Sequence, residues 1–577
     1  MSREQSLTIL SEILEILRSA KPVSKLEPEI KDCLSRFSFL ITLTANDTIE
    51  RQKLANSLSI WTKINEVFQL YLETVDADPQ LVATPLAQYK TRLIRGVILL
   101  ARNLIVGLRD LLNLDDKQRS EFYHVHGLRC KDVSGDILIQ SLYQNHFNNI
   151  IPLCLRFLDI LDSFPERSPK HSIEIYYNSI TSCFQYLNNV TNIDTKWTKQ
   201  AVPDYNVDAF LDFLTRLPQY WHAAGDQVLP DFDLLVAILM YFRNLFSQDE
   251  LLTRIFRYHS VRFIVFVGNY LSYIVPYSRG CKHFTQEQCD QLELVYLGTY
   301  MNMISHESVG SCLLEAANSN TNKETAYNAI SELLNVFQII LTSKEEGWDK
   351  LKLVNIVAWI TEYYKYASHE ASVLLDKQTL GAEESEKLAR LHKQLISVLD
   401  SLSSLTKFDS VRQMLNYYEF LPQLVAFFQV VDRNTFRKRL KDEQSPPNTK
   451  EFPQVKLIMI EIITSLVYQN FKNQELMREI HGLELILNNC NLDTNEPFIK
   501  ERAILCIKYL LLDNPGNQDF VAKLEAKGTS IDAQNKQILE QAGFEIDIED
   551  GKVKLKKSPR VTELEQGATG SCQGPNN

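Results

Sequence analysis

The sequence predicts an all-α fold, an armadillo/HEAT-like α-solenoid of helical repeats with a short C-terminal β-hairpin. Residues 463–480 and 507–524 are two copies of one pattern, set 44 residues apart without a gap. A period in the forties, with helical spacing inside each copy, is typical of armadillo and HEAT units. Such units stack into scaffolds that bind other proteins, so the pattern favours a non-enzymatic protein.

Composition supports this class and narrows the range of partners. The 577 residues include only 19 Gly and 19 Pro, which leaves few turns for an all-β fold. The formal charge of −11 argues against nucleic acid, because phosphate binding needs a basic face. The most apolar stretch, 263–275, is too short to cross a bilayer, so we expect no membrane insertion. The first helix contains glutamates and the ten cysteines form no C-x-x-C motif, so we expect a cytoplasmic protein.

Helical periodicity runs nearly from end to end, with one long break. We expect residues 1–432 to form an N-terminal helical-repeat solenoid. Residues 433–453 begin with five basic side chains and lose the apolar periodicity, which predicts a basic flexible linker. Residues 454–530 contain both copies and are expected to form a C-terminal armadillo-like domain.

The period changes after the second copy. We expect residues 531–557 to form a terminal helix and a β-hairpin, because the sequence alternates strictly around Asp550-Gly551. A two-residue turn there would place Glu549 opposite Lys552, with two further opposite-charge pairs on the same face. Residues 558–577 are predicted to be a disordered tail.

A specific resemblance starts at Leu485, where the chain reads L-I-L-N-N-C-N-L-D, followed by Pro497-Phe498 and by Asn517-Gln518-Asp519. This series resembles the C-terminal domain of the ataxin-10 family. The resemblance implies an armadillo-like, cytoplasmic, non-enzymatic protein that binds protein partners, self-associates and takes part in cytokinesis. It also brings an alternative, a copper-handling or metal homeostasis protein, because some fungal members carry a copper-transport name.

Five asparagines are the candidate partner-binding residues: Asn103, Asn244, Asn488, Asn489 and Asn491. The first two lie in R-N-L triplets, where an armadillo Asn can bond the backbone of a bound peptide; the alternative is ordinary hydrogen bonding between repeats. The equivalent positions of the two C-terminal copies are Ser465 and Tyr509, so those repeats cannot use such an amide ladder. The run 488–491 is either a loop that satisfies helix ends or a recognition surface.

Four more asparagines fall where one helix of a copy ends and the next begins: Asn470, Asn473, Asn514 and Asn517. Asn tolerates the left-handed conformation and bonds its own backbone, so capping and turn formation are the expected roles. Direct contact with a partner is the alternative.

Metal binding is considered because of the copper-transport name. Cys281, His283 and Cys289 place three side chains of ligand type within nine residues. They lack the paired spacing that fixes zinc and the close Cys or Met pairs of copper transport, so we expect no metal and no other cofactor.

No catalytic site is predicted, because nucleotide-binding, zinc-protease and serine-hydrolase motifs are absent from the sequence. Three Ser-Pro serines in predicted loops are candidate phosphorylation sites, although Ser-Pro is also common in loops by chance: Ser168, Ser445 and Ser558. An importin-type adaptor would need Trp-Asn pairs at a fixed period, and the five Trp do not provide them.

Overall fold

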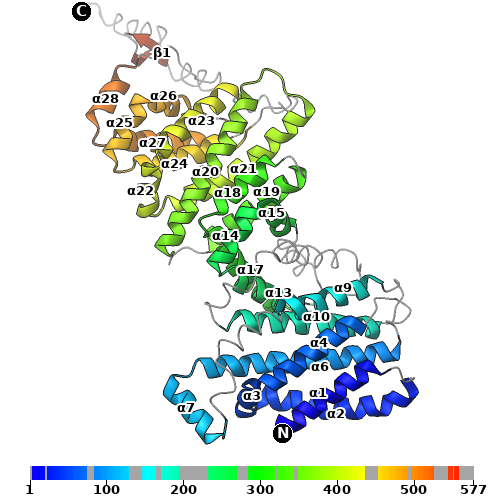
Figure 1. Cartoon of the computed structure of the whole chain (residues 1–577). Helices are drawn as coiled ribbons and strands as arrows, with labels where there is room; N and C mark the ends of the chain where they lie inside the picture. The colour runs from blue at the N-terminus through cyan, green and yellow to red at the C-terminus, as the bar shows by residue number, and fades with distance from the viewer. Residues whose placement is uncertain are drawn as a thin grey trace, which may run out of the picture. The chain divides into compact units, whose positions relative to one another are not determined.

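The computed structural model describes residues 3–19, 23–74, 84–128, 146–163, 170–193, 232–269, 284–319, 323–343, 348–435, 452–491, 493, 496–524, 544–549 and 552–557. The chain divides into two compact units, Met1–Tyr418 and Glu419–Asn577. Apart from two short strands, the elements in these ranges are helices (Figure 1), which confirms the predicted all-helical class.

The first unit contains the helices α1 (Arg3–Arg18), α2 (Val23–Asn46), α3 (Thr48–Ala55), α4 (Leu58–Thr74), α6 (Pro85–Leu112), α7 (Asp116–Val125), η1 (His146–Ile150), α9 (Ile151–Ser163), α10 (Lys170–Thr191), α13 (Phe232–Leu245), α14 (Asp249–Tyr258), α15 (Ser260–Asn269), α17 (Gln286–Ile304), α18 (Val309–Asn318), α19 (Lys323–Ser343), α20 (Lys350–Leu375), α21 (Ala382–Leu405) and α22 (Asp409–Tyr417).

The second unit contains α23 (Phe420–Asn434), α24 (Val455–Val467), α25 (Phe471–Glu479), α26 (Gly482–Asn488), α27 (Ile499–Leu511), α28 (Pro515–Ala522), β1 (Phe544–Glu549) and β2 (Lys552–Lys557). The strands pair antiparallel, with Glu549 opposite Lys552 and Asp547 opposite Lys554.

Long helices stack in sequence order along the first unit. Helix α6 packs against α2, α3 and α10, α10 packs against α13, and α13 packs against α17. Buried apolar residues recur at helical spacing on α6, among them Leu93, Val97, Leu104 and Leu108. Gly107 lets α3 approach closely, because a Cβ there would lie 2.9 Å from the backbone oxygen of Arg51. Each long helix is therefore covered by its neighbours in the array.

The junctions between helices repeat one device in both units. At five of the described junctions where a short helix follows a longer one, the residue four positions after its N-cap donates to backbone carbonyls at the end of the preceding helix. In the first unit this residue is an arginine: Arg51, Arg119 and Arg412. In the second unit it is a glutamine: Gln474 and Gln518. These side chains satisfy carbonyls that have no partner inside their own helix.

The two C-terminal copies keep their local geometry at a spacing of 44 residues. Asn470 caps α25 and Asn514 caps α28, each by accepting the backbone N–H of the residue three positions on. The residues before them, Gln469 and Asp513, have φ of 52° and 55°. The capping interpretation is thus confirmed for Asn470 and Asn514.

The predicted domain boundaries differ from the packing in one respect. Helix α23 lies within the segment 1–432 that the sequence assigns to the N-terminal solenoid, but it belongs to the second unit and packs against α24. A polar linker marks an interruption of the chain and carries no information on which neighbour a helix packs against. Residues 436–451, 525–543 and 558–577, which hold most of the linker, the terminal helix and the tail, lie outside the described residues.

Candidate partner-binding surfaces

Asn103 lies on α6 and is buried at 6% exposure. Its Nδ2 donates to the carbonyl oxygen of Ile41 at 3.1 Å and to the Thr44 hydroxyl at 3.2 Å. Its Oδ1 accepts from the guanidinium of Arg102. Asn103 therefore joins α6 to α2, and its contact with a partner stays a prediction.

Asn244 makes the same kind of link one step further along the unit. Its Nδ2 donates to Asn188, at both the side-chain and backbone oxygens, and to the Thr191 hydroxyl at 3.2 Å. Asn244 thus joins α13 to α10. Partner contact through Asn244 also stays a prediction.

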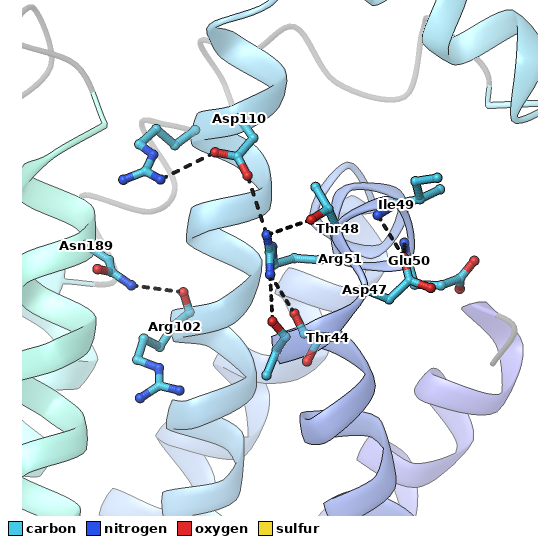
Figure 2. Close-up of polar contacts among 11 residues, drawn as sticks. Thr44, Asp47, Thr48, Ile49, Glu50, Arg51, Arg102, Asp110 and Asn189 are labelled. Atoms are coloured by element: carbon cyan, nitrogen blue, oxygen red, sulfur yellow. Dashed lines mark hydrogen bonds and ion pairs between the residues drawn. The ribbon is translucent and has the colours of Figure 1, made fainter.

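The asparagine links continue at positions that the sequence analysis did not single out. Asn189 of α10 donates to the carbonyl of Arg102 at 3.3 Å (Figure 2). Asn302 of α17 donates to the carbonyl of Arg243 at 3.2 Å, and Asn355 of α20 donates to the carbonyl of Ser305 at 2.9 Å. Side-chain amides thus link the long helices α2, α6, α10, α13, α17 and α20 in turn. These asparagines do not lie in R-N-L triplets, so only their helical spacing could have marked them as links between helices.

Arg51 anchors the start of the array (Figure 2). Its guanidinium donates to the carbonyls of Thr44 and Ala45 at 3.2 and 3.0 Å and lies 3.6 Å from the Asp110 carboxylate. The N-cap of α3, Asp47, accepts from two backbone N–H groups. These bonds fasten α3 to the end of α2 and to α6.

Two arginines of α6 face α10 and are half-buried. Arg95 donates to the Ser182 hydroxyl at 3.3 Å, and Arg102 donates to the Gln185 side chain. Burial lowers the pKa of both, and the positive charge of Arg95 lowers the pKa of Arg102 further. A depression of about 330 Å³ lies beside Arg102, and Gln185, Asn189 and Asp233 also line it.

The predicted asparagine run in the second unit divides by burial. Asn489 is buried and donates to the Leu485 carbonyl at 2.9 Å and to the Asp432 carboxylate at 3.2 Å. Asn488 is exposed, and Asn491 donates to its carbonyl at 3.2 Å. Asn489 therefore holds α26 to α23. Recognition of a partner by Asn488, Asn489 and Asn491 stays a prediction.

A buried charged cluster that the sequence analysis missed lies at the start of α24. Lys456 is 2% exposed, and its Nζ lies 3.3 Å from Asp493 and 4.0 Å from Asp432. The Glu496 carboxylate accepts the backbone N–H groups of Lys456 and Leu457, each at 3.2 Å. Burial raises the pKa of Glu496 to about 7, although these donors act to lower it. The only sign in the sequence was a lysine inside an apolar helix.

The second copy is open on the side that the first copy buries. Ile460 of α24 is 0% exposed, whereas its counterpart Ile504 of α27 is 52% exposed. At two further pairs, a fully buried residue of the first copy corresponds to a half-buried residue of the second: Ile463 and Ile507, Val467 and Leu511. Helix α24 packs between α23 and α27, while α27 packs on α24, α26 and α28. We call Ile504, Ile507, Leu511 and Gln518 the open face.

The remaining predicted sites add little. Cys289 is buried in α17, whereas Cys281 and His283 lie outside the described residues. Within the described ranges, no group of three or more His, Cys, Asp or Glu side chains is arranged to hold a metal ion. Ser168, Ser445 and Ser558 fall outside the described part of the chain. Among the helices that are described, none is long and apolar enough to span a membrane.

The chain is similar to one family model, to named relatives and to solved structures. A family model described as the spinocerebellar ataxia type 10 protein domain matches residues 455–556. A protein named Ataxin-10 homolog from Debaryomyces hansenii is 32% identical over 474 residues, which cover 81% of this chain and 80% of that protein. The Ataxin-10 homolog of Candida glabrata is 26% identical over 95% of this chain and 98% of its own length. A crystal structure of SYS-1 covers 93% of this chain and 90% of its own at 10% identity, with a TM-score of 0.26.

Proposed function

This chain belongs to the ataxin-10 family, and from that premise we propose that it is an armadillo-type scaffold that binds partner proteins and catalyses no reaction. We propose that it acts in the cytoplasm, in the control of cytokinesis, as the family resemblance implies. Self-association through the same repeats is part of this proposal. The copper-handling alternative has no supporting observation among the described residues.

The observation that carries the proposal is the open face of α27. Repeat arrays bury each unit against its neighbours, so an apolar face at the end of an array needs a cover. The three apolar residues of this face, Ile504, Ile507 and Leu511, correspond to residues that the first copy buries completely, yet Ile504 is 52% exposed. Phe498, at the start of the same helix, is 72% exposed with φ of 69°. Gln454, the counterpart 44 residues earlier, has φ of 70°, so this backbone geometry belongs to the repeat, and the exposed aromatic side chain is what favours binding.

The experiment is affinity purification of the full chain from dividing cells, comparing the wild type with Ile504→Asp. Binding of a protein to the open face would bury the new carboxylate without a counter-charge. We therefore expect the variant to lose at least one set of co-purifying proteins. The matched control is Leu294→Asp, since Leu294 is an exposed apolar residue in the first unit. Identical sets of proteins from the wild type and Ile504→Asp would refute docking at the open face.

A further inference from the structure

The half-buried arginines of α6 are the strongest unexplained feature of the first unit. Arg95 and Arg102 are seven residues apart on one face of the helix, and both point toward α10. Among the described residues, no carboxylate forms an ion pair with either of them, and their contacts are neutral side chains of α10 and α6. Guanidinium groups stay protonated in proteins, so two positive charges lie half out of water without a counter-charge.

The cost of this arrangement shows in the pKa directions. Burial lowers the pKa of Arg95 and of Arg102, and the latter also responds to the like charge of the former. Within the described part of the chain, no negative neighbour raises the pKa of either group. A pair of like charges held together in partial burial destabilises the fold, unless something outside the described residues neutralises it.

The surroundings of Arg102 supply donors that suit a peptide. The depression beside it is lined by the amides of Gln185 and Asn189, and Asn189 is already fixed by its bond to the Arg102 carbonyl (Figure 2). The guanidinium itself is held by bonds to Asn103 and Gln185, which leaves further N–H groups for an incoming oxygen. Fixed guanidinium groups bind carboxylates in two-bond geometry, which favours Glu and Asp side chains.

We propose that the α6–α10 seam at Arg95 and Arg102 binds an acidic peptide segment of a partner protein. The two arginines receive its carboxylates, and the amides of Gln185 and Asn189 bond its backbone. Asp233 lies at the α13 side of the depression. Because it would repel a carboxylate of the peptide, the acidic part of the peptide ends before this point. This inference rests on the proposed scaffold function and names the chemistry of one class of partner.

The test is fluorescence anisotropy of the full chain with a labelled peptide of alternating Glu and Ser, compared with the same peptide carrying Gln for Glu. We expect the Glu peptide to bind at least about tenfold more tightly than the Gln peptide. Its affinity should fall as the salt concentration rises from ~50 to ~200 mM. The double substitution Arg95→Gln, Arg102→Gln removes that preference. Asp233→Asn strengthens binding of the Glu peptide. The matched control is Arg92→Gln, an exposed arginine of the same helix, which changes affinity by less than about twofold.

Thermal unfolding separates a binding role from a structural one. If the arginines serve binding, the double variant without peptide melts at the same temperature as the wild type or higher, because it loses two uncompensated charges. A lower melting temperature, equal binding of the Glu and Gln peptides, or an equal effect of Arg92→Gln would overturn the proposal. Binding of a labelled single-stranded oligonucleotide, with no binding of the Glu peptide, would overturn it in favour of nucleic acid.

The peptide-binding test of the α6–α10 seam can fail or succeed independently of the Ile504→Asp test of the open face. Ile504→Asp leaves peptide affinity unchanged if the seam acts by itself. Loss of partners with Ile504→Asp, together with failure of the peptide to bind, would refute the seam and spare the scaffold function. Peptide binding without any effect of Ile504→Asp on partners would refute docking at the open face and spare the seam.

Discussion

The two C-terminal repeats share their local contacts and differ in what covers them. In both, an asparagine caps the short helix and a glutamine donates to the carbonyl seven residues before it. Gln474 also donates to the Tyr509 carbonyl at 2.9 Å and accepts from Asn514 at 3.3 Å. Gln518 is exposed and has only the local bond within the described part of the chain. Sequence repetition thus fixes the local fold, while position in the array decides which face stays open.

The largest effect is expected from substitutions of the equivalent lysines Lys456 and Lys500. We expect Lys456→Met to cost about 3–5 kcal/mol of local stability, because it leaves the buried Asp493 carboxylate without its ion-pair partner. Lys500→Met, on the exposed counterpart, should change stability by less than ~0.5 kcal/mol. Hydrogen exchange of the α24 and α27 amides measures both. Similar losses at the two positions would mean that the repeats are equally covered.

The pH dependence of α24 is the next test. Burial raises the pKa of Glu496 from 4.5 to about 7, so the folded state binds its proton more tightly than the unfolded state. The stabilisation is fully present below pH 4.5 and is lost as pH rises through about 7. Exchange rates of the α24 amides, corrected for intrinsic pH effects, should report a loss of local stability over this window. Glu496→Gln should flatten the profile, and an unchanged slope would show that another group titrates.

The glutamine pair tests the link between the repeats. Gln474→Ala removes one side chain from between two repeats and leaves the Tyr509 carbonyl without this donor, so a loss of about 1–3 kcal/mol is expected. Gln518→Ala removes one exposed bond and should cost under ~0.5 kcal/mol. Local unfolding free energies of α25 and α28 from hydrogen exchange give both values. Losses of equal size would show that Gln474 contributes nothing across the repeat boundary.

The smallest effects are expected where the repeats are alike. Gln469 and Asp513 are exposed and hold left-handed backbone, which glycine adopts without the steric penalty of a Cβ. Gln469→Gly and Asp513→Gly should each raise local stability by up to about 1 kcal/mol, and by similar amounts. Thermal unfolding of the full chain and exchange at α25 and α28 measure the gain. A gain at only one position would mean that the local geometry does not repeat.

The sequence predicted those features that depend on neighbours along the chain. Asn470 and Asn514 were expected to cap helices, because the pattern of a turn and a following helix is local. The links made by Asn189 and the buried Lys456 were not expected, because they depend on which segments meet across 37 residues or more. Asn103 was recognised as a candidate, but the sequence could not decide between a groove contact and the bond to α2 that the structure contains.

The central claim is that the open face of the second copy receives a partner protein, and photo-crosslinking in living cells tests it most directly. Benzoylphenylalanine in place of Ile504 is compared with the same substitution at Leu294, which is also exposed but lies in the first unit. The account predicts adducts between position 504 and another protein molecule, and none of these adducts from position 294. Adducts of position 504 that form only within the same molecule would contradict it, and so would the same adducts from both positions.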